Sequence, residues 1–462
     1  MDAQQVQHEV YTNDKPPTLL GGSDCGQGTF VPRRCTLLEL QAISNIMELQ
    51  SWATQNALAP SLASFVNLGA EDNESLEANR HAFSQYALRP RVLRDVANVQ
   101  TSTCILQGRV QVSFPVGIAP FAGSRAIHPD GEHAIAAAAA ASEIVYTIPH
   151  WASIPLPDIV DVHRNASTAS RHVPLFFQIY PHKPTNPNEG FDRAHMKALL
   201  EYLVQASAGS IVAVVVTCDT VNNGNREKTY KSPQWRSDLT EQVGGFPTPC
   251  ALAKAANLPP VAEVGHSAKM GWDDIRWMKK ECQKCQLALI LKGIMSAEDA
   301  ILAAETGVDA IVISNHGGRQ LDGTRGTVDV VEECVKAIGH SPTEVYVDGG
   351  IRRGKDVVKC LALGAKFVFV GRPILWGLAV SGQQGVARAI SILKDEVETV
   401  LQLMGCLSPQ HLSQEHVIRE AKTSPPRLTA LVQEQQHWVL LTATIALFSF
   451  VLGRCSTASN KN

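Results

Sequence analysis

The chain has almost no excess of charge of either sign. Its 462 residues include 41 Lys and Arg against 44 Asp and Glu, a formal net charge of −3. Domains that bind nucleic acid carry a basic excess, so we expect no nucleic-acid partner. Hydrophobic residues make up 45% of the chain and charged residues 18%. This composition predicts a globular core, and the length suffices for one large domain or two to three small ones.

The cysteines show no pattern of a disulfide framework or a zinc site. The 11 cysteines are scattered, and no apolar signal sequence opens the chain, so we expect a reducing compartment without disulfides. Cys282 and Cys285 form a CxxC pair with no second pair. We therefore interpret this pair as structural and predict no metal site.

Eight short apolar runs recur along the chain, separated by Ala- and Leu-rich stretches such as Gly131–Ser142 and Ala297–Thr306. Strands that alternate with helices indicate parallel βαβ units. Eight such units fit an α/β fold of the (β/α)8 TIM-barrel type better than a doubly wound sheet. The predicted strands are Val116–Pro120, Ile144–Ile148, Leu175–Tyr180, Ile211–Thr217, Leu287–Lys292, Asp309–Ser314, Glu344–Asp348 and Lys366–Val370.

Composition also predicts what flanks this barrel, which we place at about residues 114–405. Residues 1–34 are expected to form a flexible arm, because they are rich in Gly, Pro, Asn and Asp. One domain is predicted over residues 35–425, and the helical periodicity of Leu37–Gln55 predicts an N-terminal helical cap. The long gap after the fourth strand, from Asp219 to Gly271, predicts a lid or a mobile loop.

Residues 437–455 are predicted to form a C-terminal membrane segment. Trp438–Leu452 is almost wholly apolar and uncharged, although a spanning helix needs roughly 20 residues. The alternative is a helix packed on the barrel or on a partner, but such a helix would show a polar face. The segment therefore predicts a membrane localisation with the barrel in the cytosol, and the alternative is a cytoplasmic protein.

Chemically active residue types follow the predicted strands, where TIM barrels place their active sites. His316 and Arg319 follow the sixth strand, and Asp219 follows the fourth. A histidine titrates near neutral pH and suits a general base, while an aspartate can orient it and stabilise its charged form. An arginine offers a fixed fork of donors to a carboxylate. The pattern predicts proton abstraction from an anionic substrate.

Three other junctions predict a phosphorylated cofactor. Lys292 ends an apolar strand, and a buried cation needs an anionic partner. The seventh and eighth loops, the usual phosphate site of this fold, carry glycines that let backbone amides approach a phosphate. The residues of these loops are Gly349, Gly350, Arg352, Gly371 and Arg372.

Five motifs resemble one enzyme family. They are Ser314–Gln320 with Leu321-Asp322, Asp348–Gly354, Gly371-Arg372-Pro373, Gly224–Glu227 and Leu291-Lys292-Gly293. In this order they resemble the FMN-dependent α-hydroxy acid oxidases and dehydrogenases, which include glycolate oxidase, lactate oxidase and mandelate dehydrogenase. The resemblance runs from about Leu37 to Ile418, which is most of the chain.

The resemblance implies an oxidoreductase with FMN at the C-terminal mouth of the barrel. Lys292 would lie by the flavin N1/O2 side, Gln178 and Thr217 would hydrogen-bond the ring, and the glycines and arginines would hold the phosphate. The cofactor-binding residues that it implies are Pro120, Ala122, Gln178, Thr217, Lys292, Ser314, Asp348, Gly349, Gly350, Arg352, Gly371 and Arg372.

It also implies three catalytic residues and oxidation of a 2-hydroxy acid. His316 would take a substrate proton while a hydride equivalent reaches flavin N5, Asp219 would support His316, and Tyr180 would contact the substrate hydroxyl. Arg319 and Arg226 would bind a carboxylate. The substrate-binding residues that the resemblance implies are Arg319, Arg226, Tyr180, Trp151 and Phe65.

Two departures from the family pattern affect the substrate side. Phe65 stands where the family usually has a carboxylate-binding Tyr, and Pro149-His150 stand where it often has a Ser pair. A bulkier acid, or oxidation of a C–N bond in specialised metabolism, therefore stays open. So do a flavin-dependent isomerase without net redox change and a degenerate flavin-binding scaffold.

The electron acceptor is left open as well. The chain has no nicotinamide fingerprint, and its N-terminal arm is too short for the haem domain of some family members. Reduced FMN would then pass electrons to oxygen, a quinone or a carrier protein. Ala122 matches a residue that is common in the oxidases, and the resemblance suggests a homo-oligomer.

Overall fold

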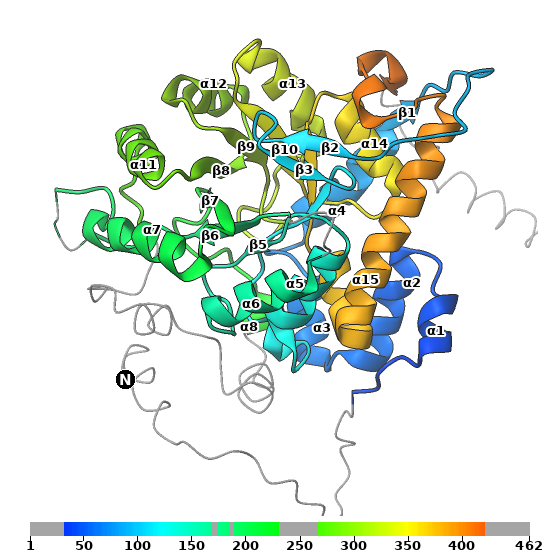
Figure 1. The fold of residues 1–462 in the computed structure, drawn as a ribbon, viewed down its shortest axis with the longest axis horizontal. Coiled ribbons are helices and arrows are strands. Elements are labelled where there is room, and N and C mark those ends of the chain that lie inside the picture. Colours follow the sequence, from blue (N-terminus) through cyan, green and yellow to red (C-terminus); the bar gives the residue numbers. More distant parts are fainter. Residues whose placement is uncertain (1–31, 168–172, 185, 187, 231–266, 421–462) are drawn as a thin grey trace, which may run out of the picture. The chain divides into compact units, whose positions relative to one another are not determined.

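The structure, a computed structural model, describes residues 32–167, 173–184, 186, 188–230 and 267–420 (Figure 1). Eight parallel strands form one sheet in the order β4-β11-β10-β9-β8-β7-β6-β5, and a parallel bridge between Ile118 and Tyr146 joins its two ends. The (β/α)8 barrel and all eight predicted strands are thereby confirmed. The strands are β4 (Val116–Ile118), β5 (Thr147–Ile148), β6 (Leu175–Ile179), β7 (Ile211–Thr217), β8 (Ala288–Ile294), β9 (Ala310–Ile313), β10 (Glu344–Asp348) and β11 (Phe367–Val370).

Helices between the strands cover the outside of the barrel (Figure 1). They are α5 (Gly131–Ala141), α6 (Leu156–Ala166), α7 (Arg193–Ser207), α8 (Glu227–Tyr230), α11 (Trp272–Lys284), α12 (Ala297–Thr306), α13 (Val328–Ile338), α14 (Gly354–Ala362) and α15 (Arg372–Leu403). The last helix is interrupted at Ser381 and Gly382, whose backbone is not helical. The carbonyls just before this break accept hydrogen bonds from the Arg34 side chain and the Cys35 N–H.

The strands contribute to two apolar layers because their side chains alternate between the two faces of the sheet. In β8, Ala288 and Ile290 point into the barrel, whereas Leu289 and Leu291 pack against the surrounding helices. The same alternation places Lys292, the next residue of the inner series, inside the barrel at its C-terminal end.

A hairpin closes the N-terminal end of the barrel. Its strands are β2 (Thr103–Ile105) and β3 (Val110–Val112), and their apolar side chains join the cluster inside the barrel. Glu344, at the start of β10, accepts hydrogen bonds from Leu106 N and Gln107 N, both at 2.8 Å, and from the Tyr346 hydroxyl at 2.6 Å. This end of the barrel is therefore closed by the chain itself.

The N-terminal cap consists of α1 (Leu37–Ala42), α2 (Ile46–Trp52), α3 (Pro60–Asn67) and α4 (Glu74–His81), with a π-helical turn at Ala53–Ala57. The helical cap is thus confirmed, but the helical segment predicted over Leu37–Gln55 is divided. Asn45 explains the break, because its Oδ1 accepts hydrogen bonds from Met47 N and Glu48 N, both at 3.0 Å, and so caps a new helix.

The cap is bonded to the loops at the C-terminal end of the barrel. The amides of Asn79 in α4 and Asn315 after β9 exchange two hydrogen bonds, of 2.7 and 3.0 Å. Asp322 accepts from the backbone N–H groups of Asp72, Glu74 and Ser75 at the start of α4. At the other end of the domain, β1 (Tyr86–Leu88) pairs antiparallel with β12 (Val417–Arg419).

One seam of the barrel carries less main-chain pairing than the others. Between β4 and β5 there is a single bridge, but a buried carboxylate joins the loops that follow these strands. Glu132 accepts hydrogen bonds from Ser124 N at 3.3 Å and from Ser153 N at 2.9 Å and Oγ at 2.5 Å. It thereby fixes the two loops to each other.

Several predicted segments fall wholly or mostly outside the described residues. They are the arm, most of the long loop after β7, and the C-terminal segment 437–455. Within the part of the chain that the structure describes, no helix has the length and apolar character needed to cross a membrane. The predicted domain limits at residues 35 and 425 stay a prediction.

Candidate active site

At the C-terminal mouth of the barrel, several strands carry polar side chains that point into the barrel. Below the mouth these positions are apolar, as with Phe176 of β6 and Val312 of β9. Two residues further along the chain, the same face of β6, β7, β8, β9 and β10 carries a polar or charged side chain. The side chains placed in this way are Gln178, Thr217, Lys292, Ser314 and Asp348, and all are buried.

A cavity of about 340 Å³ opens at this mouth. Of the predicted site residues, all but Asp219, Thr217 and Ser314 line it. Each of these three hydrogen-bonds a residue that does: Asp219 bonds His316 (3.0 Å), Thr217 bonds Gln178 (2.9 Å) and Ser314 bonds Lys292 (2.9 Å). The structure therefore brings the whole predicted set together in two layers.

His316 and Asp219 form a pair at one side of this cavity. Nδ1 of His316 lies 3.0 Å from Oδ1 of Asp219, and the His316 backbone is held in the left-handed region at φ 58°. Burial lowers the pKa of His316, with Lys292 acting in the same direction and Asp219 against it. Burial alone would raise the pKa of Asp219, but the charges of His316 and Lys292 outweigh it and lower this pKa to about 2. His316 is charged at the low pH at which Asp219 titrates, and it loses its proton as the pH rises toward neutrality. Near neutral pH the pair is thus a neutral imidazole on a carboxylate, with Nε2 able to accept a proton.

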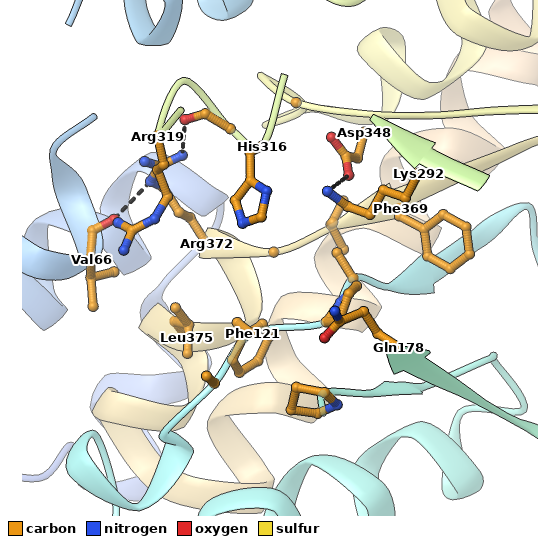
Figure 2. A pocket seen from close by; sticks show the side chains of 18 of the residues that line it. Val66, Phe121, Gln178, Lys292, His316, Arg319, Asp348, Phe369, Arg372 and Leu375 are labelled. Carbon is orange, nitrogen blue, oxygen red and sulfur yellow. Dashed lines mark hydrogen bonds and ion pairs between the residues drawn. The ribbon is translucent and has the colours of Figure 1, made fainter. Parts of the chain in front are cut away.

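Lys292 provides a buried positive charge next to this pair. Its Nζ donates to Ser314 Oγ at 2.9 Å and lies 3.5 Å from Asp348 Oδ2 (Figure 2). Burial would lower the pKa of Lys292, but the charges of Asp348 and Asp219 outweigh it and raise this pKa. Oδ1 of Asp348 is buried and has no hydrogen-bond partner among the described residues. The Lys292 ammonium is therefore charged, and Oδ1 of Asp348 can still accept a hydrogen bond.

Two arginines bring further positive charge to the cavity. Arg352 lies over the Trp376 ring at 4.8 Å, and its buried Nε has no partner among the described residues. Arg372 donates to the carbonyls of Val66 (2.7 Å), Gly317 (2.8 Å) and Leu68 (3.0 Å), as Figure 2 shows in part. Burial, then mutual repulsion among neighbouring arginines, lowers the pKa of Arg352 to about 10 and that of Arg372 to about 9. In the described part of the chain neither has a carboxylate ion pair, so this region fits an anion such as a phosphate.

The three predicted glycines differ in what requires them. Gly349 and Gly350 have φ of 98° and 78°, and a Cβ on Gly350 would lie 2.0 Å from the carbonyl oxygen of Asn79. These two glycines are therefore explained by their own backbone and by the cap. A Cβ on Gly371 would meet nothing closer than 3.9 Å, which leaves room for a ligand beside its backbone.

The predicted substrate residues lie on loops and on the cap. Arg226 donates to the carbonyl of Arg319 (3.0 Å) and to Gln320 Oε1 (3.0 Å). The Arg319 guanidinium lies 4.6 Å from the centre of the Phe65 ring and donates to the Phe65 carbonyl. Its charge is therefore held at the wall of the cavity by an aromatic face.

Tyr180 adds a phenol to this wall. Its ring lies 5.6 Å from that of Trp151, and burial raises its pKa to about 12. The phenol therefore keeps its proton over the physiological range and can donate a hydrogen bond.

Other residues that line the cavity were not predicted from the sequence, among them Thr220 and Leu375. Thr220 lines the cavity, and its hydroxyl donates to Asp219 Oδ1 at 3.1 Å. Leu375, in the first turn of α15, lines the cavity below His316 (Figure 2). Thr220 is adjacent to a predicted residue and Leu375 lies three positions after Arg372, so helical spacing could have indicated it.

Comparisons with known proteins agree with this site. The family model described as FMN-dependent dehydrogenase matches residues 54–419. A peroxisomal (S)-2-hydroxyacid oxidase of Arabidopsis thaliana is 37% identical over 82% of this chain and 98% of that protein. A 2-hydroxyacid oxidase of Bos taurus is 38% identical over 78% of this chain and 94% of that protein.

Solved structures give the same result. A mandelate oxidase variant with (S)-mandelic acid has a TM-score of 0.65 and 31% identity, covering 79% of this chain and 96% of that one. A flavocytochrome b2 variant with sulfite has a TM-score of 0.70 and 28% identity, covering 85% of this chain and 92% of that one.

The predicted membrane localisation is wrong by these findings. The described residues contain no helix able to span a bilayer, and relatives that match over most of their length are named as peroxisomal enzymes. The apolar segment 437–455 itself lies outside the described residues, and its lack of a polar face was too little to decide a location.

The barrel, the polar residues gathered at its mouth and the match over residues 54–419 lead to one conclusion: the chain belongs to the FMN-dependent dehydrogenase family and is an FMN-dependent oxidoreductase.

Proposed function

We propose that this enzyme oxidises a 2-hydroxy acid to the corresponding 2-oxo acid, with His316 as the base. One observation carries the proposal: His316, which is bonded to Asp219, shares a cavity with Lys292, Arg226 and Arg319. A base, a buried cation and two carboxylate-binding groups are what such a reaction needs. The relatives named as 2-hydroxyacid oxidases support the choice of substrate class.

Residues of the strand ends would hold the FMN. Lys292 and Gln178 line the cavity and would donate to the electron-rich edge of the flavin, supported by Ser314 and Thr217. The Nε of Arg352, which has no partner among the described residues, and the open space beside Gly371 support a phosphate in this part of the cavity. The remaining predicted contacts are Pro120, Ala122, Asp348, Gly349, Gly350 and Arg372. When bound, FMN supplies the two-electron acceptor of the reaction.

The chain's own residues would bind the substrate and remove its proton. Arg226 and Arg319 would hold the carboxylate, and the protonated phenol of Tyr180 would contact the substrate hydroxyl. Nε2 of His316 would then accept the proton, while the ionised Asp219 holds Nδ1–H and stabilises the imidazolium. In total the substrate loses two protons and two electrons.

The test is anaerobic bleaching of the flavin by a panel of 2-hydroxy acids and cyclic amines. Bleaching by a 2-hydroxy acid, with release of the 2-oxo acid, supports the proposal. Bleaching by amines alone would favour oxidation of a C–N bond, and product formation without bleaching would indicate an isomerase. No reaction with any compound would indicate a flavin-binding scaffold.

Molecular oxygen is the electron acceptor that we propose, because the curated relatives are named oxidases. Release of hydrogen peroxide in step with product would support it, and turnover with a quinone or a carrier protein alone would contradict it. The domain at 35–425 and a homo-oligomeric assembly are also proposed.

A further inference from the structure

Three buried histidines lie behind the cavity wall, outside the roles described so far. His150 follows β5, His182 lies in the loop after β6, and His195 lies in the first turn of α7; they are 3%, 3% and 2% exposed. The ring centres of His150 and His182 are 5.0 Å apart, those of His182 and His195 are 5.2 Å apart, and both contacts are edge to face. The rings therefore form a row that leads away from the cavity, which we call the histidine row.

Hydrogen bonds fix how His150 carries its proton. The backbone N–H of Tyr180 donates to His150 Nδ1 at 3.4 Å, so Nδ1 must be the unprotonated nitrogen. A neutral ring then carries its proton on Nε2. That nitrogen lies 3.3 Å from Nε2 of His182, which accepts the bond and must carry its own proton on Nδ1. His150 thus selects the tautomer of His182.

His150 accepts a hydrogen bond from Tyr180, whose backbone N–H lies outside the main-chain pairing of the barrel. The pairing between β6 and β7 ends at Ile179, so the N–H of Tyr180 lies beyond the ladder. His150 Nδ1 supplies its acceptor, and the two rings lie 6.3 Å apart. Tyr180 itself lines the cavity, so a shift of its backbone would move the phenol relative to the substrate.

We propose that His150 and His182 are positioning residues for Tyr180. His150 would hold the Tyr180 backbone at the end of β6, and His182 would keep His150 in the tautomer that can do so. This inference rests on the proposed function, in which the phenol of Tyr180 contacts the substrate hydroxyl. It also gives a role to the Pro149-His150 departure found in the sequence, because a serine could not bridge from β5 to both Tyr180 and His182.

Three variants separate the two bonds of His150, each measured as holoenzyme by anaerobic stopped-flow reduction with the best 2-hydroxy acid of the panel. His150→Leu removes both bonds, and we expect the limiting rate of reduction to fall roughly tenfold to a hundredfold, since a misplacement of about 1 Å can cost that much. In His150→Asn the amide oxygen replaces Nδ1, so the rate should return to within about threefold of wild type. His182→Leu removes only the tautomer partner and should give a loss between these two.

The FMN content and the substrate concentration for half-maximal reduction should stay near wild type in all three variants. A double-mutant comparison then isolates Tyr180. In a Tyr180→Phe background, His150→Leu should cause little further loss, because the hydroxyl that it positions is already gone. If His150→Leu does not fold, His182→Leu replaces it in both backgrounds.

Three results would overturn the inference: a wild-type rate in His150→Leu, no recovery in His150→Asn, or an equal loss in the Tyr180→Phe background. These are distinct from failure of the proposed function, in which no 2-hydroxy acid reduces the wild-type flavin at all.

Discussion

The two ends of the barrel treat charged side chains in opposite ways. At the N-terminal end, two half-buried carboxylates beside the hairpin are paired by the protein's own groups. Glu344 accepts from two backbone N–H groups and a hydroxyl, and Asp309 pairs with Arg109 (2.6 Å) and Lys279 (2.5 Å). These contacts satisfy half-buried groups and so stabilise the fold.

At the C-terminal end, charged groups are left incompletely satisfied. Asp219 Oδ2, Asp348 Oδ1 and Arg352 Nε are buried and have no partner among the described residues. An unsatisfied buried group costs about 1–3 kcal/mol. A ligand that supplies the missing partners would remove this cost. The C-terminal mouth of the barrel is therefore suited to binding, whereas the N-terminal end contributes to stability.

The substitution with the largest expected effect is His316→Asn at the mouth. It should lower the limiting rate of flavin reduction on the order of a hundred- to ten-thousand-fold, the usual contribution of a general base, and leave FMN bound. Stopped-flow reduction at saturating substrate checks the rate, and thermal unfolding checks the fold. A loss below about tenfold would remove His316 from the role of base.

The same residue sets an expectation for pH. Because burial lowers the pKa of His316, its neutral, base form should persist below the ordinary value of about 6.5. The limiting rate of reduction should therefore stay high down to that pH and fall only at lower pH. A rate that already falls between pH 8 and 7 would show that another group titrates.

The residues of the mouth could be predicted because of the period of a strand. Lys292, Asp348 and Gln178 each lie one or two positions from the end of an apolar run, so the parity of the run decides that they point inward. His316 was predicted from its place in the loop after a strand, three residues before Arg319 and at the same end of the barrel as Asp219.

Other parts of the site depend on contacts that no local pattern contains. The three carbonyls bound by Arg372 come from the cap and from the loop after β9, which meet only in the folded chain. The histidine row likewise joins three elements. The division of Leu37–Gln55 was missed because apolar periodicity outweighed the capping side chain of Asn45.

The second mouth substitution, Arg352→Gln, tests the anion site. Loss of a charged donor should weaken FMN binding roughly 10- to 100-fold, from about 1.5–3 kcal/mol for a hydrogen bond to a charged group. Fluorescence titration of the deflavinated enzyme measures the affinity. Arg353→Gln is the control, because Arg353 pairs with Glu396 (3.0 Å) and is not part of the cavity lining. Equal effects of the two changes would mean that Arg352 has no specific role.

At the N-terminal end of the barrel, Glu344→Ala should lower the stability of the fold and leave the reaction unaffected. Leaving Leu106 N and Gln107 N without their acceptor should lower the free energy of unfolding by about 2 kcal/mol, while the rate of flavin reduction per bound FMN stays unchanged. Denaturant unfolding and stopped-flow reduction give the two quantities. A tenfold change in that rate would break the distinction between the two ends.

The smallest effect is expected for Phe65→Tyr, which adds a hydroxyl to the wall beside Arg319. One further hydrogen bond to a small carboxylate has a net value of about 1 kcal/mol, so KM for glycolate and lactate should fall about fivefold. Steady-state kinetics on both acids test this. If wild type and variant use glycolate equally well, Phe65 does not determine specificity.

The single bridge between β4 and β5 has a consequence for how the barrel opens. Regions with few main-chain hydrogen bonds undergo local unfolding first, so the amides around Ile118 and Tyr146 should exchange with deuterium sooner than those of the fully paired β6 and β7. Glu132 limits this opening by holding the loops above the seam. Those loops carry Phe121 and Trp151, which line the cavity. A ligand would therefore enter and leave beside the seam that opens most readily.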